Sequence, residues 1–183
     1  MSEVSQFVHI SPTQKRIHWT TVLFLIVVFV AAVVRGSAES KIFRTLSLNI
    51  HELFGLGVLA LAVVRIFLVA TGKRSSIIRG LVPRAGHTLI YLTLLYQPLI
   101  GVLAAQATGG KALNLFSLQI PQYLPADEDF STALLEVHGF IGWAFLAIIV
   151  GHIAMAIWHV HVQGDQHARE MMPEIKNINK GEK

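Results

Sequence analysis

The sequence predicts an all-α integral membrane protein, a single membrane domain over residues 1–183 built as a bundle of four transmembrane helices. Hydrophobic residues fill 53% of the chain and charged residues only 14%, whereas about a quarter of a soluble domain is charged. Four apolar runs cover about residues 17–34, 48–70, 87–106 and 132–160. Each run is close to or above the roughly 20 residues that cross a bilayer core. Because lipid offers no hydrogen bonds to the backbone, such runs are predicted to be helices.

The first run follows the basic pair Lys15 and Arg16, an arrangement that resembles a cleaved signal peptide. The run is long for a signal peptide, however, and the basic pair comes after fourteen residues of polar leader. We therefore expect an uncleaved first span.

The connection between the last two spans, about residues 107–131, contains the segment ALNLFSLQIPQYLP. Its mixture of apolar and polar residues predicts an amphipathic structure that lies on the outer surface of the membrane. Pro121 and Pro125 are expected to end that structure.

The distribution of lysine and arginine predicts the orientation of the bundle. One side carries ten of these residues, at the two termini and between the second and third runs: Lys15, Arg16, Lys73, Arg74, Arg79, Arg84, Arg169, Lys176, Lys180 and Lys183. The other side carries only four: Arg35, Lys41, Arg44 and Lys111. The positive-inside rule then places both termini in the cytoplasm. The formal net charge of +4 follows from this topology and gives no reason to expect nucleic acid as a partner.

The chain contains no cysteine. Disulfides, cysteine-ligated iron–sulfur clusters and covalently attached c-type haem are therefore excluded. Any haem must be b-type, held by side chains and packing alone.

The histidines of the apolar runs fall at two depths. His138 and His152 are fourteen residues apart, which in a helix is about 21 Å and almost four turns, so the two side chains share one face. His51 begins the second run, which enters from the outer side, and so it matches the depth of His138. His18 or His87 could match His152 near the inner side. Since histidine within a span is costly and marks function, this pattern predicts two metal centres stacked along the bundle interior.

A polar residue near the end of a span is more often an interfacial group than a ligand. The remaining histidines lie at or beyond the predicted membrane edges and are given that interpretation: His9, His159, His161 and His167.

Three further residues agree with cofactor sites between the helices. Gly55 and Gly142 each follow a proposed outer ligand by four residues on the same helix face, where a missing side chain leaves room for a flat macrocycle. Arg65 lies fourteen residues after His51 and is the only basic residue deep within an apolar run. A buried cation needs an anionic partner, and a haem propionate or a polar quinone group would serve. The alternative is that Arg65 snorkels to the cytoplasmic edge.

Seven motifs along the chain together resemble the bacterial cytochrome b561 family: RIHW at 16–19, NIHELFG at 49–55, VVR at 63–65, AGHTLIYL at 85–92, PLIGVL at 98–103, the histidine pair of the fourth run, and MMP at 171–173. The layout also resembles the cytochrome b subunits of membrane formate dehydrogenases and nickel–iron hydrogenases. The resemblance implies a bacterial inner-membrane protein with two b-type haems. Carried over by position, His51 and His138 would ligate the iron of the outer haem. His18 and His152 would ligate the inner one, which makes His87 a pocket residue near that haem or a quinone.

The resemblance further implies electron transfer between a donor and membrane ubiquinone. Stand-alone bacterial members are associated with oxidising superoxide to O2, so the chain is expected to be a superoxide:quinone oxidoreductase without an obligate protein partner. Two bis-histidine haems would leave no open iron position, so electrons would pass at the exposed haem edge. The outer loop carries Arg35, Lys41 and Arg44 against Glu39, a positive excess that could steer an anionic donor. The alternative for these basic residues is ordinary interfacial anchoring.

Two other functions fit parts of the sequence. The chain could be the haem subunit of a larger quinone-reducing dehydrogenase, although its modest loops offer little docking surface. It could also be a metal-ion transporter that uses intramembrane histidines. Transport sites gather acidic and polar residues near the midplane, whereas Glu52 and Glu136 both lie near the outer ends of their spans.

Overall fold

The computed structural model describes residues 10–71, 81–109, 113–115 and 118–172. Its four long helices are α1 (Pro12–Ser37), α2 (Lys41–Ala70), α3 (Leu81–Ala107) and α4 (Glu128–His161). A short helix, α5 (Gln166–Met171), follows α4. The four long helices contain the four apolar runs and extend beyond them, so the predicted all-helical membrane fold is confirmed. Seven basic residues of the predicted loops and C-terminal tail lie outside the described residues: Lys73, Arg74, Arg79, Lys111, Lys176, Lys180 and Lys183.

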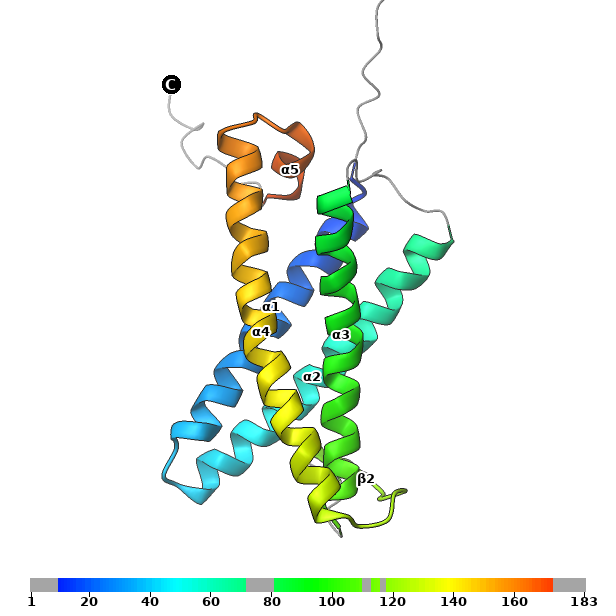
Figure 1. The fold of residues 1–183 in the computed structure, drawn as a ribbon, viewed down its shortest axis with the longest axis vertical. Helices are drawn as coiled ribbons and strands as arrows, with labels where there is room; N and C mark the ends of the chain where they lie inside the picture. The colour runs from blue at the N-terminus through cyan, green and yellow to red at the C-terminus, as the bar shows by residue number, and fades with distance from the viewer. Residues whose placement is uncertain (1–9, 72–80, 110–112, 116–117, 173–183) are drawn as a thin grey trace, which may run out of the picture.

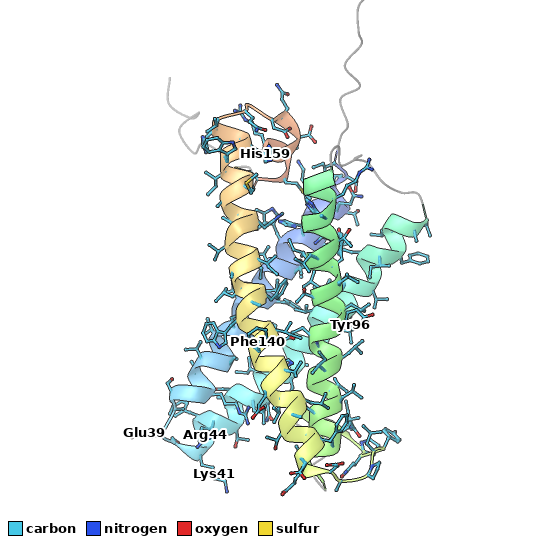
Figure 2. All side chains as sticks on the ribbon, in the orientation of Figure 1. Glu39, Lys41, Arg44, Tyr96, Phe140 and His159 are labelled. Carbon is cyan, nitrogen blue, oxygen red and sulfur yellow. The ribbon has the colours of Figure 1, made fainter. Side chains whose placement is uncertain are left out.

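All four helices are long and apolar enough to cross a membrane. In the most apolar window of each, only 6% to 17% of the residues are buried within the protein. Large apolar side chains therefore point outwards, among them Phe140 on α4 and Tyr96 on α3 (Figure 2), which are 77% and 57% exposed. An apolar exterior on helices of this length is what a bilayer solvates, so the chain is a multi-pass membrane protein.

The helices begin where local sequence satisfies their free N–H groups. The Ser11 hydroxyl accepts a hydrogen bond from the Gln14 N–H at 3.3 Å, and Pro12 occupies the first helical position of α1. The Asp127 carboxylate accepts from the Phe130 N–H at 2.9 Å at the start of α4. Glu128 and Asp129 follow in the first turn of α4, where negative charges interact favourably with the helix dipole and stabilise the helix.

The connection between α3 and α4 contains a two-stranded antiparallel sheet, β1 (Leu113–Leu115) and β2 (Leu118–Ile120). The Gln106 side chain fixes this connection to α3, since its Nε2 donates to the Pro121 carbonyl at 3.2 Å and its Oε1 accepts from the Tyr123 N–H at 2.8 Å. Gly109 has φ +73°, and a Cβ there would approach Ala126 Cβ at 2.8 Å. The turn after α3 therefore requires glycine.

The long helices form two antiparallel pairs, α1 with α2 and α3 with α4, and the pairs meet mainly through α2 and α3. Figure 1 shows the two pairs crossing, with the start of α1 and α5 at the same end of the bundle. At that end the Ile10 N–H donates to Glu170 Oε2 at 3.0 Å and the Trp19 indole N–H donates to the Met171 carbonyl at 3.0 Å. The end of the described chain is thus tied to the start of α1.

A small buried core occupies the middle of the bundle. It consists of four residues from α2, α3 and α4: Val58, Ala62, Leu94 and Phe145. Partly buried residues of α1 pack against them, including Phe24, Leu25 and Val28. Gly57 makes this packing possible, since a Cβ there would overlap the Phe24 ring, with its nearest atom at 2.5 Å.

The core separates two levels of polar side chains. Phe145 lies seven residues after His138 and seven before His152, and seven residues are almost two helical turns, so the three share one face of α4. The same spacing recurs as His51, Val58 and Arg65 on α2, and as His87, Leu94 and Gly101 on α3. The bundle therefore has an apolar middle layer with a histidine-bearing layer on each side.

Candidate haem-binding sites

The predicted ligand histidines lie in the two layers that flank the core. We use the name outer level for His51 and His138, and inner level for His18, His87 and His152, after the predicted orientation. Both levels bring together residues from opposite helix pairs, α1 and α2 on one side and α3 and α4 on the other.

At the outer level the rings of His51 and His138 face each other. Their centroids are 5.9 Å apart and their planes are inclined by 74°. Two metal–nitrogen bonds of about 2 Å each would place two axial imidazole centres about 6 Å apart. The separation of the two rings therefore fits one iron bound between them, as in a bis-histidine haem.

Backbone carbonyls fix the protonation of both outer rings. His51 Nδ1 lies 3.0 Å from the Val28 carbonyl oxygen and His138 Nδ1 lies 3.1 Å from the Gln97 carbonyl oxygen. A carbonyl oxygen only accepts, so each Nδ1 carries the proton and donates it. Nε2 is left with a free lone pair on each ring, which is the arrangement that metal-binding histidines use.

Glycines open space around the outer rings, though not all in the predicted way. A Cβ at Gly55 would meet nothing within 4 Å, so this position leaves room beside His51. A Cβ at Gly142 would instead lie 3.2 Å from Gln97 Nε2, and one at Gly101 would lie 3.1 Å from His138 Cε1. Gly142 and Gly101 thus permit the close approach of α3 and α4 at His138.

At the inner level the histidine rings in contact are those of His87 and His152. Their centroids are 5.4 Å apart and their planes are nearly perpendicular, at 89°. Among the described residues, however, no three His, Cys, Asp or Glu side chains gather closely enough to hold one metal ion. Depth alone thus leaves two possible partners for His152, and the pairing of His18 with His152 stays a prediction.

Arg65 lies at the inner level, fourteen residues along α2 from His51. One of its terminal nitrogens is 3.5 Å from His18 Nδ1, and its Cζ lies 5.5 Å from the centre of the Tyr91 ring. Within the described part of the chain no carboxylate forms an ion pair with this guanidinium. Its contacts are thus a neutral ring nitrogen and an aromatic face, so an anionic group of a cofactor remains a suitable partner.

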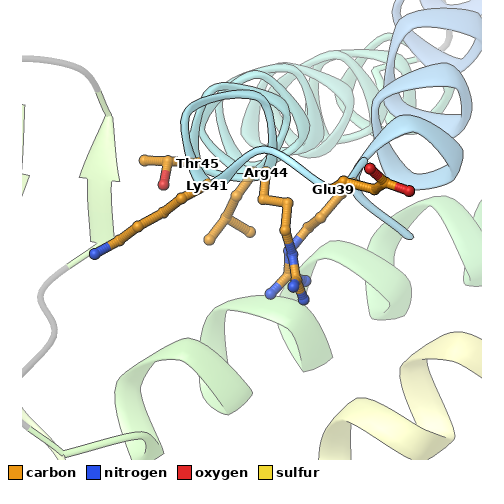
Figure 3. A pocket seen from close by; sticks show the side chains of 6 residues that line it. Glu39, Lys41, Arg44 and Thr45 are labelled. Atoms are coloured by element: carbon orange, nitrogen blue, oxygen red, sulfur yellow. The ribbon is translucent and has the colours of Figure 1, made fainter. Parts of the chain in front are cut away.

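An open hollow of about 430 Å³ lies at the predicted outer loop. It is lined by the three basic residues Arg35, Lys41 and Arg44, together with Glu39, Thr45 and Leu48. Figure 3 shows the Lys41 and Arg44 side chains extending in different directions from the start of α2, with the Glu39 carboxylate turned away from both. Figure 2 places these residues at the end of the bundle opposite His159.

Three of the four histidines given an interfacial interpretation lie near the end of the bundle that holds α5. His159 and His161 are in the last turn of α4, and His159 Nδ1 is buried with no hydrogen-bond partner in the described part of the chain. His167 falls within α5, and His9 lies outside the described residues.

Gln97 and Gly101 are neighbours of the outer level that sequence reasoning missed. Gln97 contacts His138 through both its backbone and its side chain. The sequence feature that could have identified Gln97 is a polar amide in the middle of a mostly apolar run, directly before Pro98. The signal of Gly101 was its position fourteen residues after His87 on α3.

Comparisons with known proteins show which family the chain belongs to. The family model described as prokaryotic cytochrome b561 matches residues 9–174. The chain is 25% identical over 177 residues to "Cytochrome b561 homolog 1" of Escherichia coli K12, covering 91% of this chain and 98% of that protein. It is 27% identical over 165 residues to "Probable superoxide oxidase CybB" of Yersinia pestis, covering 86% and 92% respectively. These matches imply a b-type haem and an oxidoreductase role. The chain belongs to the prokaryotic cytochrome b561 family of membrane electron-transfer proteins.

Proposed function

We propose that this protein is a superoxide:ubiquinone oxidoreductase with two b-type haems, one ligated by His51 and His138 and the other by His18 and His152. The observation that carries the proposal is the outer level, where two rings 5.9 Å apart both have Nδ1 engaged by a backbone carbonyl. The name of the Yersinia pestis relative supports superoxide as the donor. The resemblance to the family supports His18 rather than His87 as the inner ligand.

When bound, the haems would supply one-electron oxidation and reduction. The protein's part would be to present His51 and His138 with free Nε2 lone pairs. His51 and His138 would hold the metal between them and so would keep small molecules from binding to it. The apolar layer of Val58, Leu94 and Phe145 would keep water from the space between the levels.

The donor side would use the open hollow lined by Arg35, Lys41 and Arg44. Three cations against the single carboxylate of Glu39 would give this surface a positive potential, which concentrates a small anion such as superoxide. Each of these three basic side chains lines the hollow, so each would contribute to the potential. Two superoxide anions would each lose one electron to become O2.

The acceptor side would be at the inner level. One ubiquinone would take both electrons with two protons and leave as ubiquinol. His87 would be a pocket residue beside the inner haem or the quinone, and the Arg65 guanidinium would neutralise an anionic group there. Lysines and arginines at both termini favour a cytoplasmic location of this end in a bacterial inner membrane.

The test is to reconstitute the purified protein in liposomes that contain ubiquinone and to supply superoxide enzymatically. We expect loss of superoxide with one ubiquinol formed for every two superoxide anions, and no ubiquinol when superoxide dismutase is added first. Ubiquinol formation that continues with dismutase present would contradict superoxide as the donor.

The same preparation separates the other two functions. A co-purifying iron–sulfur subunit, without which quinone is not reduced, would indicate the haem subunit of a larger dehydrogenase. Colourless protein that carries zinc would indicate the metal-ion transporter.

A further inference from the structure

Gln97 of α3 is hydrogen-bonded to His138 of α4 through two separate groups. Its side-chain Nε2 donates to the His138 carbonyl oxygen at 2.6 Å, and its own carbonyl oxygen accepts from His138 Nδ1 at 3.1 Å. The short hydrogen bond from the Gln97 side-chain amide fixes the distance between the backbones of α3 and α4 at this point. That distance in turn sets the length of the hydrogen bond to the imidazole.

The surroundings are shaped for this double contact. Gly142 leaves the space that the Gln97 amide occupies, since a Cβ there would lie only 3.2 Å from Nε2. Gly101 leaves the space of the ring, since a Cβ there would lie 3.1 Å from His138 Cε1 and 3.4 Å from Nδ1. Gly142 lies four residues after His138 on α4 and Gly101 lies four residues after Gln97 on α3, which is about one helical turn in each case.

The orientation of the Gln97 amide follows from its partner. The His138 carbonyl can only accept, so Nε2 must face it and Oε1 must point the other way. Oε1 is buried, and it has no hydrogen-bond partner among the described residues. A buried acceptor without a partner is costly, and it leaves the negative end of an amide dipole unscreened close to His138.

We propose that Gln97 is the positioning residue that sets the reduction potential of the outer haem through His138. This inference rests on the proposed haem at His51 and His138. A firm hydrogen bond from Nδ1 to a carbonyl makes the imidazole a stronger donor to the metal. The buried Oε1, which has no hydrogen-bond partner among the described residues, adds negative potential in the same place. Both effects favour the oxidised metal, so both lower the potential.

The central variant is Gln97→Met, which keeps the length of the side chain and removes both the donor and Oε1. Redox titration followed optically should show a raised midpoint for the outer haem and an unchanged midpoint for the inner haem. Loss of a contact to a metal-ligating histidine typically changes metal binding or activity by about 10-fold to 100-fold. We expect about a tenfold change in the reduction equilibrium, which is about 59 mV for one electron.

A second variant protects the test against misfolding of the first. Gly142→Ala leaves Gln97 intact and pushes its amide away from the His138 carbonyl by a few tenths of an ångström, because the added Cβ would lie at 3.2 Å. The outer midpoint should rise in this variant too, by less than in Gln97→Met. Gly139→Ala is the matched control on the same helix, since a Cβ there meets nothing within 4 Å, and its midpoint should equal the wild-type value.

Electron paramagnetic resonance of the oxidised protein gives a readout of ring orientation that is independent of activity. The low-spin signal of the outer haem should shift in Gln97→Met and Gly142→Ala and stay in place in Gly139→Ala. Unchanged outer potential and signal in both variants would overturn the role of Gln97 and leave the proposed function standing. Wild-type protein that lacks haem at His51 and His138 would overturn both.

Discussion

The outer and inner levels of the bundle hold their histidines in different ways. At the outer level each ring donates from Nδ1 to the backbone of a neighbouring helix, His51 to Val28 and His138 to Gln97. At the inner level the His87 and His152 rings contact each other. There His18 Nδ1 instead faces the Arg65 guanidinium at 3.5 Å.

The difference concerns which nitrogen is ready to bind metal. A guanidinium can only donate, so any hydrogen bond to His18 Nδ1 places the imidazole proton on Nε2. Ligation through Nε2 would then require Arg65 to release His18 and the proton to move to Nδ1. The fold of the outer level thus leaves Nε2 free on both rings, whereas ligation by His18 through Nε2 would require a rearrangement around Arg65.

The largest expected effect is loss of one haem when a ligand is removed. His51→Ala or His138→Ala should abolish the outer haem, because no spare histidine lies at that level in the described chain. His152→Ala and His18→Ala should abolish the inner haem. Haem per protein and low-temperature absorption spectra would be measured for each variant, and the outer haem should survive both inner substitutions.

His87→Ala sharpens the comparison at the inner level. We expect this variant to retain both haems, with a changed inner spectrum at most. If His87→Ala loses the inner haem while His18→Ala keeps it, the inner ligands are His87 and His152, and the ring contact of 5.4 Å is the ligand pair.

The next effect concerns the charges at the outer end. Arg35→Gln or Arg44→Gln should lower the second-order rate of reduction by superoxide by about 10-fold at low salt. Raising the salt should slow the wild type towards the variants, because screening shortens to about 8 Å at physiological ionic strength. Pulsed superoxide with optical detection of haem reduction provides the rates.

Glu39→Gln is the control with opposite sign, since Glu39 lines the same hollow. It should raise the rate with superoxide, whereas reduction by a neutral quinol should respond to none of these substitutions. Equal salt dependence for superoxide and quinol would mean that the basic residues only anchor the protein at the membrane surface.

The smallest effect is expected from Arg65. Arg65→Leu removes a positive charge from the inner level, so adding an electron there becomes less favourable and the inner midpoint should fall. A unit charge about 8–16 Å away at an effective dielectric constant of about 20 accounts for roughly 1–2 kcal/mol, or on the order of 50–100 mV. Potentiometric titration would measure both haems, and a shift confined to the outer haem would contradict this assignment.

The membrane fold could be predicted from the sequence because hydropathy over about 20 residues is a strong signal. The ends of the helices were less visible. The run of α2 begins at residue 48 but the helix starts at Lys41, since helical backbone can continue past the apolar region where water and the interface supply hydrogen bonds. The pairing of β1 with β2 depends on contacts across a turn, which hydropathy does not register.

The candidate site was predictable to the depth of each histidine and no further. The fourteen-residue spacing of His138 and His152 identified two levels, and at the outer level depth left a single partner, His51. At the inner level, depth does not distinguish His18 from His87 as the second ligand beside His152, and only the family resemblance favours His18. Gln97 was missed because its role depends on where α4 crosses α3, which no pattern within α3 alone reveals.

The central claim is that the two levels hold two haems within one chain. The most direct measurement is the haem content of the purified wild-type protein by pyridine haemochrome assay, combined with its reduced-minus-oxidised spectrum. The account predicts two b-type haems per chain, both low-spin and with distinct midpoints. One haem per chain, a high-spin signal with an open iron position, or a colourless protein would contradict it.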